Sequence, residues 1–155
     1  MLSCDYERMK NKINTFARFG DTGKGGITRF SLSEEALRAR EEVKKRMEAI
    51  GATIATDDMA NMYATIPGTE NLPAIVTGSH LDSVREGGNY DGILGVLTGM
   101  EALETIVKND IPHRHPLTLV VWTNEEGARF EPAMMSSGVI CGKFQKEEML
   151  NSEAK

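Results

Sequence analysis

The strongest constraint on the fold is a pair of apolar segments with one helical segment between them. Residues 72–79 (LPAIVTGS) and 116–124 (PLTLVVWTN) are compact apolar runs, which are typical of strands buried on both faces. Residues 92–108 carry apolar residues at helical spacing, and three glycines there leave a flat face for packing against a sheet. A strand, a crossover helix and a second strand form a right-handed unit in which the two strands are parallel. We therefore expect an α/β fold with these two strands in one sheet.

The part of the chain before this unit is expected to contain two helices and a pair of strands. Residues 4–18 have helical apolar spacing, and so do residues 33–50, for which Ser31 and Ser33 are candidate N-caps. Residues 52–66 alternate around turn signals, which predicts two short strands joined by a turn. The polar C-terminal tail shows no closing strand and no helix cap.

Composition and charge indicate one soluble domain without nucleic-acid or membrane partners. The 155 residues are 40% hydrophobic and 26% charged, and 23 acids against 18 bases give a net charge of −5 without a basic tract. No apolar run approaches the roughly 18 residues of a membrane span, and the N-terminus lacks the apolar core of a signal peptide. Cys4 and Cys141 form neither a disulfide framework nor a zinc motif. We expect a protein of the reducing cytoplasm.

Polar side chains follow both predicted strands at the points where the strands end. His80 follows the first strand, and Glu125 and Glu126 follow the second. The carboxyl ends of parallel strands lie at one edge of a sheet, where α/β proteins place their sites. Asp91 stands at the start of the helix that joins the strands, so it is expected at the same edge. The order of the elements thus brings four candidate ligands or bases together from three segments.

Each of these residues also has a structural interpretation. Asp91 alone could be a helix N-cap, Asp82 a loop acid, and His80 a hydrogen-bonded structural histidine. The adjacent carboxylates of Glu125 and Glu126 repel each other at neutral pH, and a cation or a shared proton relieves that repulsion. A histidine combined with carboxylates suits zinc, manganese or cobalt better than calcium. Asp82, two residues after His80, would then accept the imidazole's other N–H and determine the tautomer.

A second histidine pair, His113 and His115, is expected to take no part in such a site. The pair lies between the predicted helix and the start of the second strand, and a proline flanks it on each side. That position is the opposite edge of the sheet from His80, and position in the fold outweighs ligand type.

Three segments of this chain resemble a known family. GSHLDSVREGGNYDGILGV and VVWTNEEGARFEPAMMSSG resemble the N-terminal part of the N-carbamoyl-L-amino-acid hydrolase and allantoate amidohydrolase family, within the two-metal aminoacylase and carboxypeptidase superfamily. The segment from Gly25 to Asn61 resembles the family's opening, so the likeness covers roughly residues 15–145. Only eight residues separate Asp82 from Asp91, and this short connection is the form found in the carbamoyl-type amidohydrolases.

The resemblance implies a three-layer αβα sandwich around a mixed, partly parallel sheet, and a role for each matched residue. His80 would bind one of two divalent metals (zinc, manganese or cobalt), Asp91 would bridge both, and Glu126 would bind the other. Glu125 would act as the general base without touching metal, and Asp82 would support His80. The implied reaction is metal-assisted hydrolysis of a non-peptide C–N bond in a small carbamoyl or ureido substrate, either an N-carbamoyl-L-amino acid or allantoate.

Members of this homodimeric family are much longer than 155 residues. The resemblance therefore implies that residues 1–155 are the N-terminal portion of the catalytic domain. The dimerisation (lid) domain, the C-terminal part of the catalytic domain, two histidine ligands and the substrate-binding residues are expected beyond residue 155. With two protein ligands for each metal, we expect weak metal binding and little turnover, together with exposed apolar sheet surface.

Two alternatives stay open. The chain could be a metallopeptidase or aminoacylase of the same superfamily, which the short spacing between Asp82 and Asp91 disfavours. It could also be a non-catalytic truncated module that keeps the fold but not the chemistry. The intact set of candidate residues argues against that second alternative.

Overall fold

The computed structural model describes residues 3–155, and these form helices and strands in the order that the sequence patterns predict up to the last strand. The elements are α1 (Tyr6–Phe16), α2 (Glu34–Glu48), β1 (Thr53–Thr56), β2 (Met62–Ile66), β3 (Ile75–His80), α3 (Ile93–Lys108), β4 (Leu117–Trp122), α4 (Met135–Ile140) and α5 (Lys146–Leu150). The sequence patterns did not predict α4 and α5, since each is too short for a helical period to emerge.

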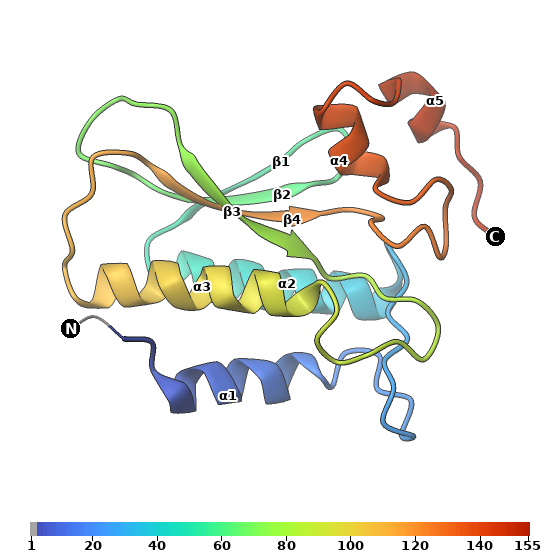
Figure 1. Ribbon diagram of the computed structural model, residues 1–155, viewed down its shortest axis with the longest axis horizontal. Coiled ribbons are helices and arrows are strands. Elements are labelled where there is room, and N and C mark those ends of the chain that lie inside the picture. Colours follow the sequence, from blue (N-terminus) through green and yellow to red (C-terminus); the bar gives the residue numbers. More distant parts are fainter. Residues whose placement is uncertain (1–2) are drawn as a thin grey trace.

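The four strands form one mixed sheet in the order β1-β2-β4-β3 (Figure 1). β1 and β2 form an antiparallel pair, and β2 is also antiparallel to β4. β3 and β4 are parallel, with Ile75 beside Leu117 and His80 beside Trp122. α3 connects these two strands and packs against both of them. The predicted strand–helix–strand unit is therefore confirmed.

The helices lie on both sides of the sheet. α2 and α3 lie against one face and α1 lies beyond them, whereas α4 and α5 lie on the other side, near the end of β4 (Figure 1). This arrangement confirms an α/β sandwich around a mixed, partly parallel sheet. Between residues 3 and 155, no helix has both the length and the apolar character needed to cross a membrane.

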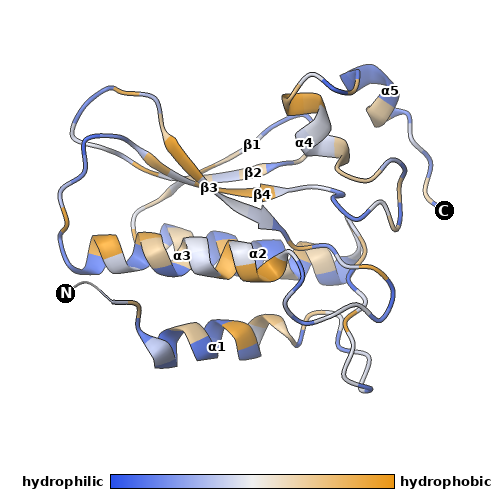
Figure 2. Cartoon of the chain, in the orientation of Figure 1, coloured by the Kyte–Doolittle hydropathy of each residue, from blue (hydrophilic) through white to orange (hydrophobic). Residues whose placement is uncertain are grey.

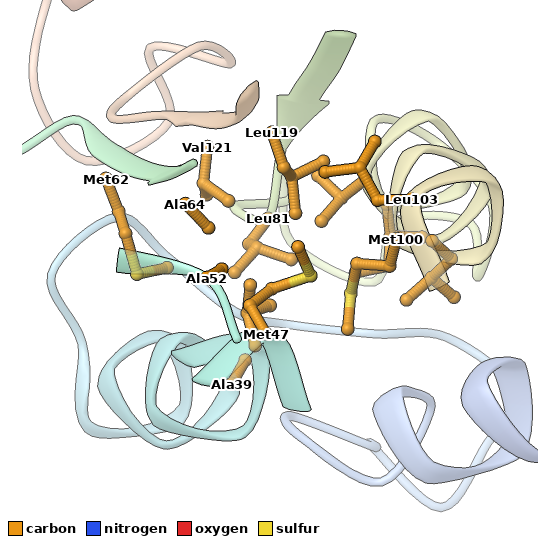
Figure 3. Close-up of a cluster of buried hydrophobic side chains, with 14 of the residues drawn as sticks. Ala39, Met47, Ala52, Met62, Ala64, Leu81, Met100, Leu103, Leu119 and Val121 are labelled. Carbon is orange, nitrogen blue, oxygen red and sulfur yellow. The ribbon is translucent and has the colours of Figure 1, made fainter. Parts of the chain in front are cut away.

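The main core lies between the sheet and the helices α2 and α3. Figure 3 shows side chains of α2, α3 and the strands meeting there, with Met47, Met100, Leu119 and Val121 among them. α2 presents its buried stripe to this core and begins at Ser33, whose hydroxyl accepts the N–H of Ala36. Each large apolar side chain buried in this way stabilises the fold by about 1.5–3 kcal/mol.

The prediction that β3 is buried on both faces is wrong for its first half. Ile75 and Val76 are 57% and 54% exposed, although both belong to the hydrophobic start of the strand in Figure 2. β3 is one of the two edge strands of the sheet, so one of its sides has no neighbouring strand in the described part of the chain. β4 has a strand on each side and is buried from Leu117 to Val121, as predicted.

A buried ion-pair cluster joins α1 to α3. Lys12 is fully buried, and its Nζ lies 2.6 Å from Glu101 and 2.7 Å from Glu104. Arg8 donates two hydrogen bonds to the Glu101 carboxylate, at 2.8 and 2.5 Å. Burial opposes the ionisation of Glu101, but the hydrogen bonds from Arg8 and Lys12 outweigh it and lower its pKa to about 2. The ionised form of Glu101 therefore strengthens the attachment of α1 to α3.

Candidate metal centre

The carboxyl ends of β3 and β4 lie side by side and form the middle of the candidate site. His80 is the last residue of β3, and Glu125 and Glu126 follow β4 closely. Asp91 lies just before α3, which begins at Ile93. Parallel pairing of the two strands brings both of their ends to one edge, and the crossover helix returns to that edge with its N-terminus.

Three of the predicted ligands come within metal-binding reach of one another. His80, Asp91 and Glu126 each offer one ligand atom, and these atoms all lie within 4.8 Å of one another. Nε2 of His80 is 4.0 Å from Oδ1 of Asp91 and 3.5 Å from Oε2 of Glu125. Glu125 therefore lies beside the three-residue cluster, where a base would have to be.

The orientation of the His80 ring leaves its Nε2 available to bind a cation. Its Nδ1 lies 2.9 Å from the backbone carbonyl of Asp82, and because a carbonyl only accepts, Nδ1 must carry a hydrogen. A neutral ring then directs the lone pair of Nε2 towards the carboxylates of Asp91 and Glu125. Acceptors facing acceptors are unfavourable unless a metal ion or a proton lies between them. The donor set of one imidazole and several carboxylates suits zinc, manganese or cobalt.

Asp82 supports the site through its backbone as well as its side chain. The predicted partner of the His80 imidazole was the Asp82 carboxylate, but Oδ1 lies 3.6 Å from Nδ1, whereas the backbone oxygen lies at 2.9 Å. The carboxylate instead accepts the backbone N–H groups of Glu125 at 3.3 Å and Glu126 at 3.1 Å. Asp82 is 4% exposed, so these hydrogen bonds are made away from water. One buried residue thus connects the ends of both strands.

A tight turn brings Asp91 to the site. The N–H of Ile93 donates to the carbonyl of Asp91 at 2.6 Å across Gly92, whose φ of 62° and ψ of −54° correspond to a strained γ-turn. A Cβ on Gly92 would lie 2.2 Å from Nε2 of His80, so only glycine allows this close approach. No side chain caps the start of α3, and the Asp91 side chain is 71% exposed. Asp91 is therefore not the helix N-cap that its position alone would indicate.

Mutual repulsion of the acids is evident at Glu126. Partial burial raises the pKa of Glu126, and the neighbouring charge of Asp91 raises it further, while His80 acts in the opposite direction. Glu125 and Asp82 add to the repulsion. The site thus concentrates negative charge beside one imidazole, which is the electrostatic setting that a divalent cation relieves.

No protein-family model matches the chain, but individual known proteins resemble it. An N-carbamoyl-L-amino-acid amidohydrolase of Rhizobium meliloti is 40% identical over 138 residues, which are 88% of this chain and 33% of that protein. An allantoate amidohydrolase of Bacillus subtilis is 34% identical over 145 residues, which are 90% of this chain and 35% of that protein. Over most of its own length, the chain is therefore similar in sequence to N-carbamoyl-L-amino-acid and allantoate amidohydrolases.

A solved structure of an amidase shares the fold of this chain. The crystal structure of a hydantoinase/carbamoylase family amidase from Burkholderia multivorans superposes with a TM-score of 0.97 at 37% identity, over 99% of this chain and 38% of that chain. The chain therefore spans about a third of the length of the relatives that it matches.

His113 and His115 lie far from the candidate metal centre. They lie between α3 and β4, at the amino end of β4, which is the opposite edge of the sheet from His80. Nδ1 of His113 bonds the backbone oxygen of His115, and Nδ1 of His115 bonds that of Pro73, both at 2.8 Å. Both rings therefore hold loop backbone in place, at the edge of the sheet opposite His80 that the sequence predicted for them.

Sequence reasoning missed Gly92 as a functional residue. Gly92 is needed because the imidazole of His80 lies against it, and His80 is twelve residues earlier in the chain. The available signal was a glycine directly after Asp91, at a helix start where a capping side chain is usual. That signal indicates an unusual backbone conformation at Gly92, but it does not indicate the contact with the His80 ring.

Proposed function

We propose that this chain belongs to a metal-dependent amidohydrolase that cleaves a non-peptide C–N bond in a carbamoyl or ureido substrate. The observation that carries the proposal is the His80 ring, whose Nδ1 is committed to the backbone oxygen of Asp82. Nε2 is thereby left as a free ligand atom within 4.8 Å of ligand atoms of Asp91 and Glu126. The names of the relatives, an N-carbamoyl-L-amino-acid and an allantoate amidohydrolase, support the substrate class.

We propose that His80, Asp91 and Glu126 together hold one divalent cation in this chain. Three protein ligands with an open position for water is the usual arrangement of a catalytic zinc site. When bound, the cation would supply Lewis acidity, polarising the substrate carbonyl and lowering the pKa of water towards about 7. The second ion expected from the family resemblance would share Asp91 and would need ligands from outside these residues.

Glu125 is the proposed general base. Its carboxylate lies 3.5 Å from Nε2 of His80 and is 31% exposed, so it is close to the ligand cluster and open to water. The Asp82 carboxylate anchors its backbone N–H, which limits the directions that the side chain can take. Glu125 would accept a proton as the water oxygen adds to the substrate carbonyl carbon, and would pass that proton to the leaving nitrogen as the C–N bond breaks. A carbamate released in this way decomposes to carbon dioxide and ammonia.

The place of the chain in a larger protein is part of the same proposal. Because the chain spans about a third of its relatives, we assign residues 1–155 to the N-terminal portion of a catalytic domain. Substrate-binding residues and further metal ligands would then come from sequence outside this chain. We place the protein in the cytoplasm, since Cys4 and Cys141 are both free and exposed, which suits a reducing compartment.

Metal titration followed by a substrate comparison tests the proposal. Calorimetric titration of the metal-free protein with Zn²⁺ or Mn²⁺ is expected to show one ion for each chain. Ammonia release is then measured with N-carbamoyl-L-amino acids and with allantoate, and amino-acid release with dipeptides. Binding without any turnover would favour a non-catalytic module. Failure to bind either ion would refute the proposed centre.

A further inference from the structure

Arg29 is a buried cation that the proposed reaction does not use. It is 3% exposed and lies on the segment between α1 and α2. Burial lowers the pKa of Arg29 to about 10, against the opposing effect of the Asp82 carboxylate. Removing a guanidinium from water costs several kcal/mol unless its donors are satisfied, so the location of this residue requires a physical reason.

The guanidinium of Arg29 joins two separate segments. Its Nε donates to the carbonyl of Leu81 at 2.6 Å, and its Nη1 donates to the carbonyls of Phe16 at 3.2 Å and Phe19 at 2.8 Å. Leu81 directly follows β3, whereas the two phenylalanines lie at the end of α1. Arg29 therefore ties the residue after His80 to the end of a helix.

The backbone of Arg29 holds the same loop at a second point. Its N–H donates to Oγ of Ser83 at 2.9 Å, and its carbonyl accepts the N–H of Ser83 at 2.9 Å. Two residues earlier, Ile27 exchanges a pair of backbone hydrogen bonds with Gly87, at 2.9 and 2.8 Å. Residues 27–29 thus run alongside the loop that follows β3 and brace it.

Asp82 lies between the two loop residues that Arg29 holds. The Asp82 carbonyl accepts the Nδ1–H of His80, and its carboxylate accepts the N–H groups of Glu125 and Glu126. A shift of this loop would release the imidazole and loosen the backbone of both glutamates together. The brace and the candidate metal centre are therefore connected through one residue.

We propose that Arg29 is a positioning residue for the metal centre. It fixes the loop on both sides of Asp82, and Asp82 in turn sets the tautomer and direction of the His80 ring. The effect on metal affinity rests on the proposed function, whereas the effect on the tautomer does not. A buried guanidinium suits this task because its planar fork bonds three carbonyls from two segments at once.

The test replaces the guanidinium and follows two properties of the folded protein. Arg29→Met removes all the side-chain donors, and we expect the affinity for Zn²⁺, measured by calorimetry, to fall about tenfold or more. Nitrogen-15 spectra of His80 in the metal-free protein should change from the Nδ1–H tautomer to a mixture. Arg29→Lys keeps the charge but cannot reach all three carbonyls, so it should give intermediate values of both readouts.

Lys12→Met is the matched control. Lys12 is also a fully buried cation of the N-terminal region, but its Nζ bonds Glu101 and Glu104 on α3 rather than the loop after β3. Its replacement should lower the free energy of unfolding while leaving Zn²⁺ affinity and the His80 tautomer unchanged. The control thus separates loss of positioning from loss of stability.

Unchanged Zn²⁺ affinity and an unchanged His80 tautomer in folded Arg29→Met would overturn the inference. If Arg29→Met does not fold, Arg29→Lys decides the question on the same two readouts. A wild-type protein that binds no Zn²⁺ would contradict the proposed function. In that case the tautomer in the Arg29 variants would still support or overturn the positioning role.

Discussion

Replacing Gly92 with alanine should disable the metal centre while leaving the fold largely intact. A Cβ at this position would lie 2.2 Å from Cε1 and Nε2 of His80, whereas ordinary contacts begin at 3.4 Å. The imidazole would therefore have to move by about 1 Å, which is several times the roughly 0.2 Å tolerance of a metal–ligand distance. The strained γ-turn conformation of Gly92 adds a backbone cost of about 1–3 kcal/mol for a residue with a Cβ.

The assay for Gly92→Ala is calorimetric titration with Zn²⁺, combined with thermal unfolding. Loss of one ligand from a three-ligand site is expected to weaken Zn²⁺ binding at least tenfold, which corresponds to about 1.4 kcal/mol. The backbone cost alone should lower Tm by about 2–4 °C for each kcal/mol in a chain of this size. A folded variant with weakened Zn²⁺ binding is therefore expected.

Gly51→Ala is the control for the backbone term. Gly51 also has a positive φ, of 89°, but no atom lies within 4 Å of its virtual Cβ. The control should lose stability without losing metal affinity. Wild-type Zn²⁺ affinity in folded Gly92→Ala would refute the argument, because it would mean that the His80 ring need not occupy its present position for a metal to bind.

Three further perturbations test other parts of the structure. Asp91→Ala should lower Zn²⁺ affinity at least tenfold in the same titration, and equal affinity would exclude Asp91 from the site. Because the pKa of Glu101 is about 2 in the folded protein against 4.5 as its ordinary value, its stabilising effect is complete above pH 4.5 and is lost as the pH falls towards 2. In urea unfolding across that range, the free energy of unfolding should fall by up to about 3 kcal/mol in the wild type and should not show this fall in Glu101→Gln. Equal pH profiles of the two proteins would contradict the role of the cluster. Val76→Lys on the exposed edge strand β3 should reduce self-association, measured by light scattering. It should change the free energy of unfolding by less than about 0.5 kcal/mol. Unchanged self-association would show that this edge is not the associating surface.

Patterns confined to one segment predicted the elements well. The helical spacing of residues 92–108 and the apolar runs on either side yielded the β3–α3–β4 unit, and parallel pairing of its strands followed from the single crossover. The burial of β3 was mispredicted because it depends on which strands lie beside it, and an apolar run carries no information about its neighbours. The same run is buried in a central strand and half exposed in an edge strand.

The candidate site also has features that the sequence predicted and features that it did not. Residue types and their places at strand ends were enough to select His80, Asp91, Glu125 and Glu126, since element order determines which edge of the sheet they reach. The hydrogen-bond partners were not predictable, because the carbonyl and the carboxylate of Asp82 belong to one residue and differ only in direction. The contact of Gly92 with an imidazole, and the brace that Arg29 forms, arise only when distant segments pack together. Spacing along a chain encodes short-range periodicity, whereas distances between segments are set by packing of the whole domain.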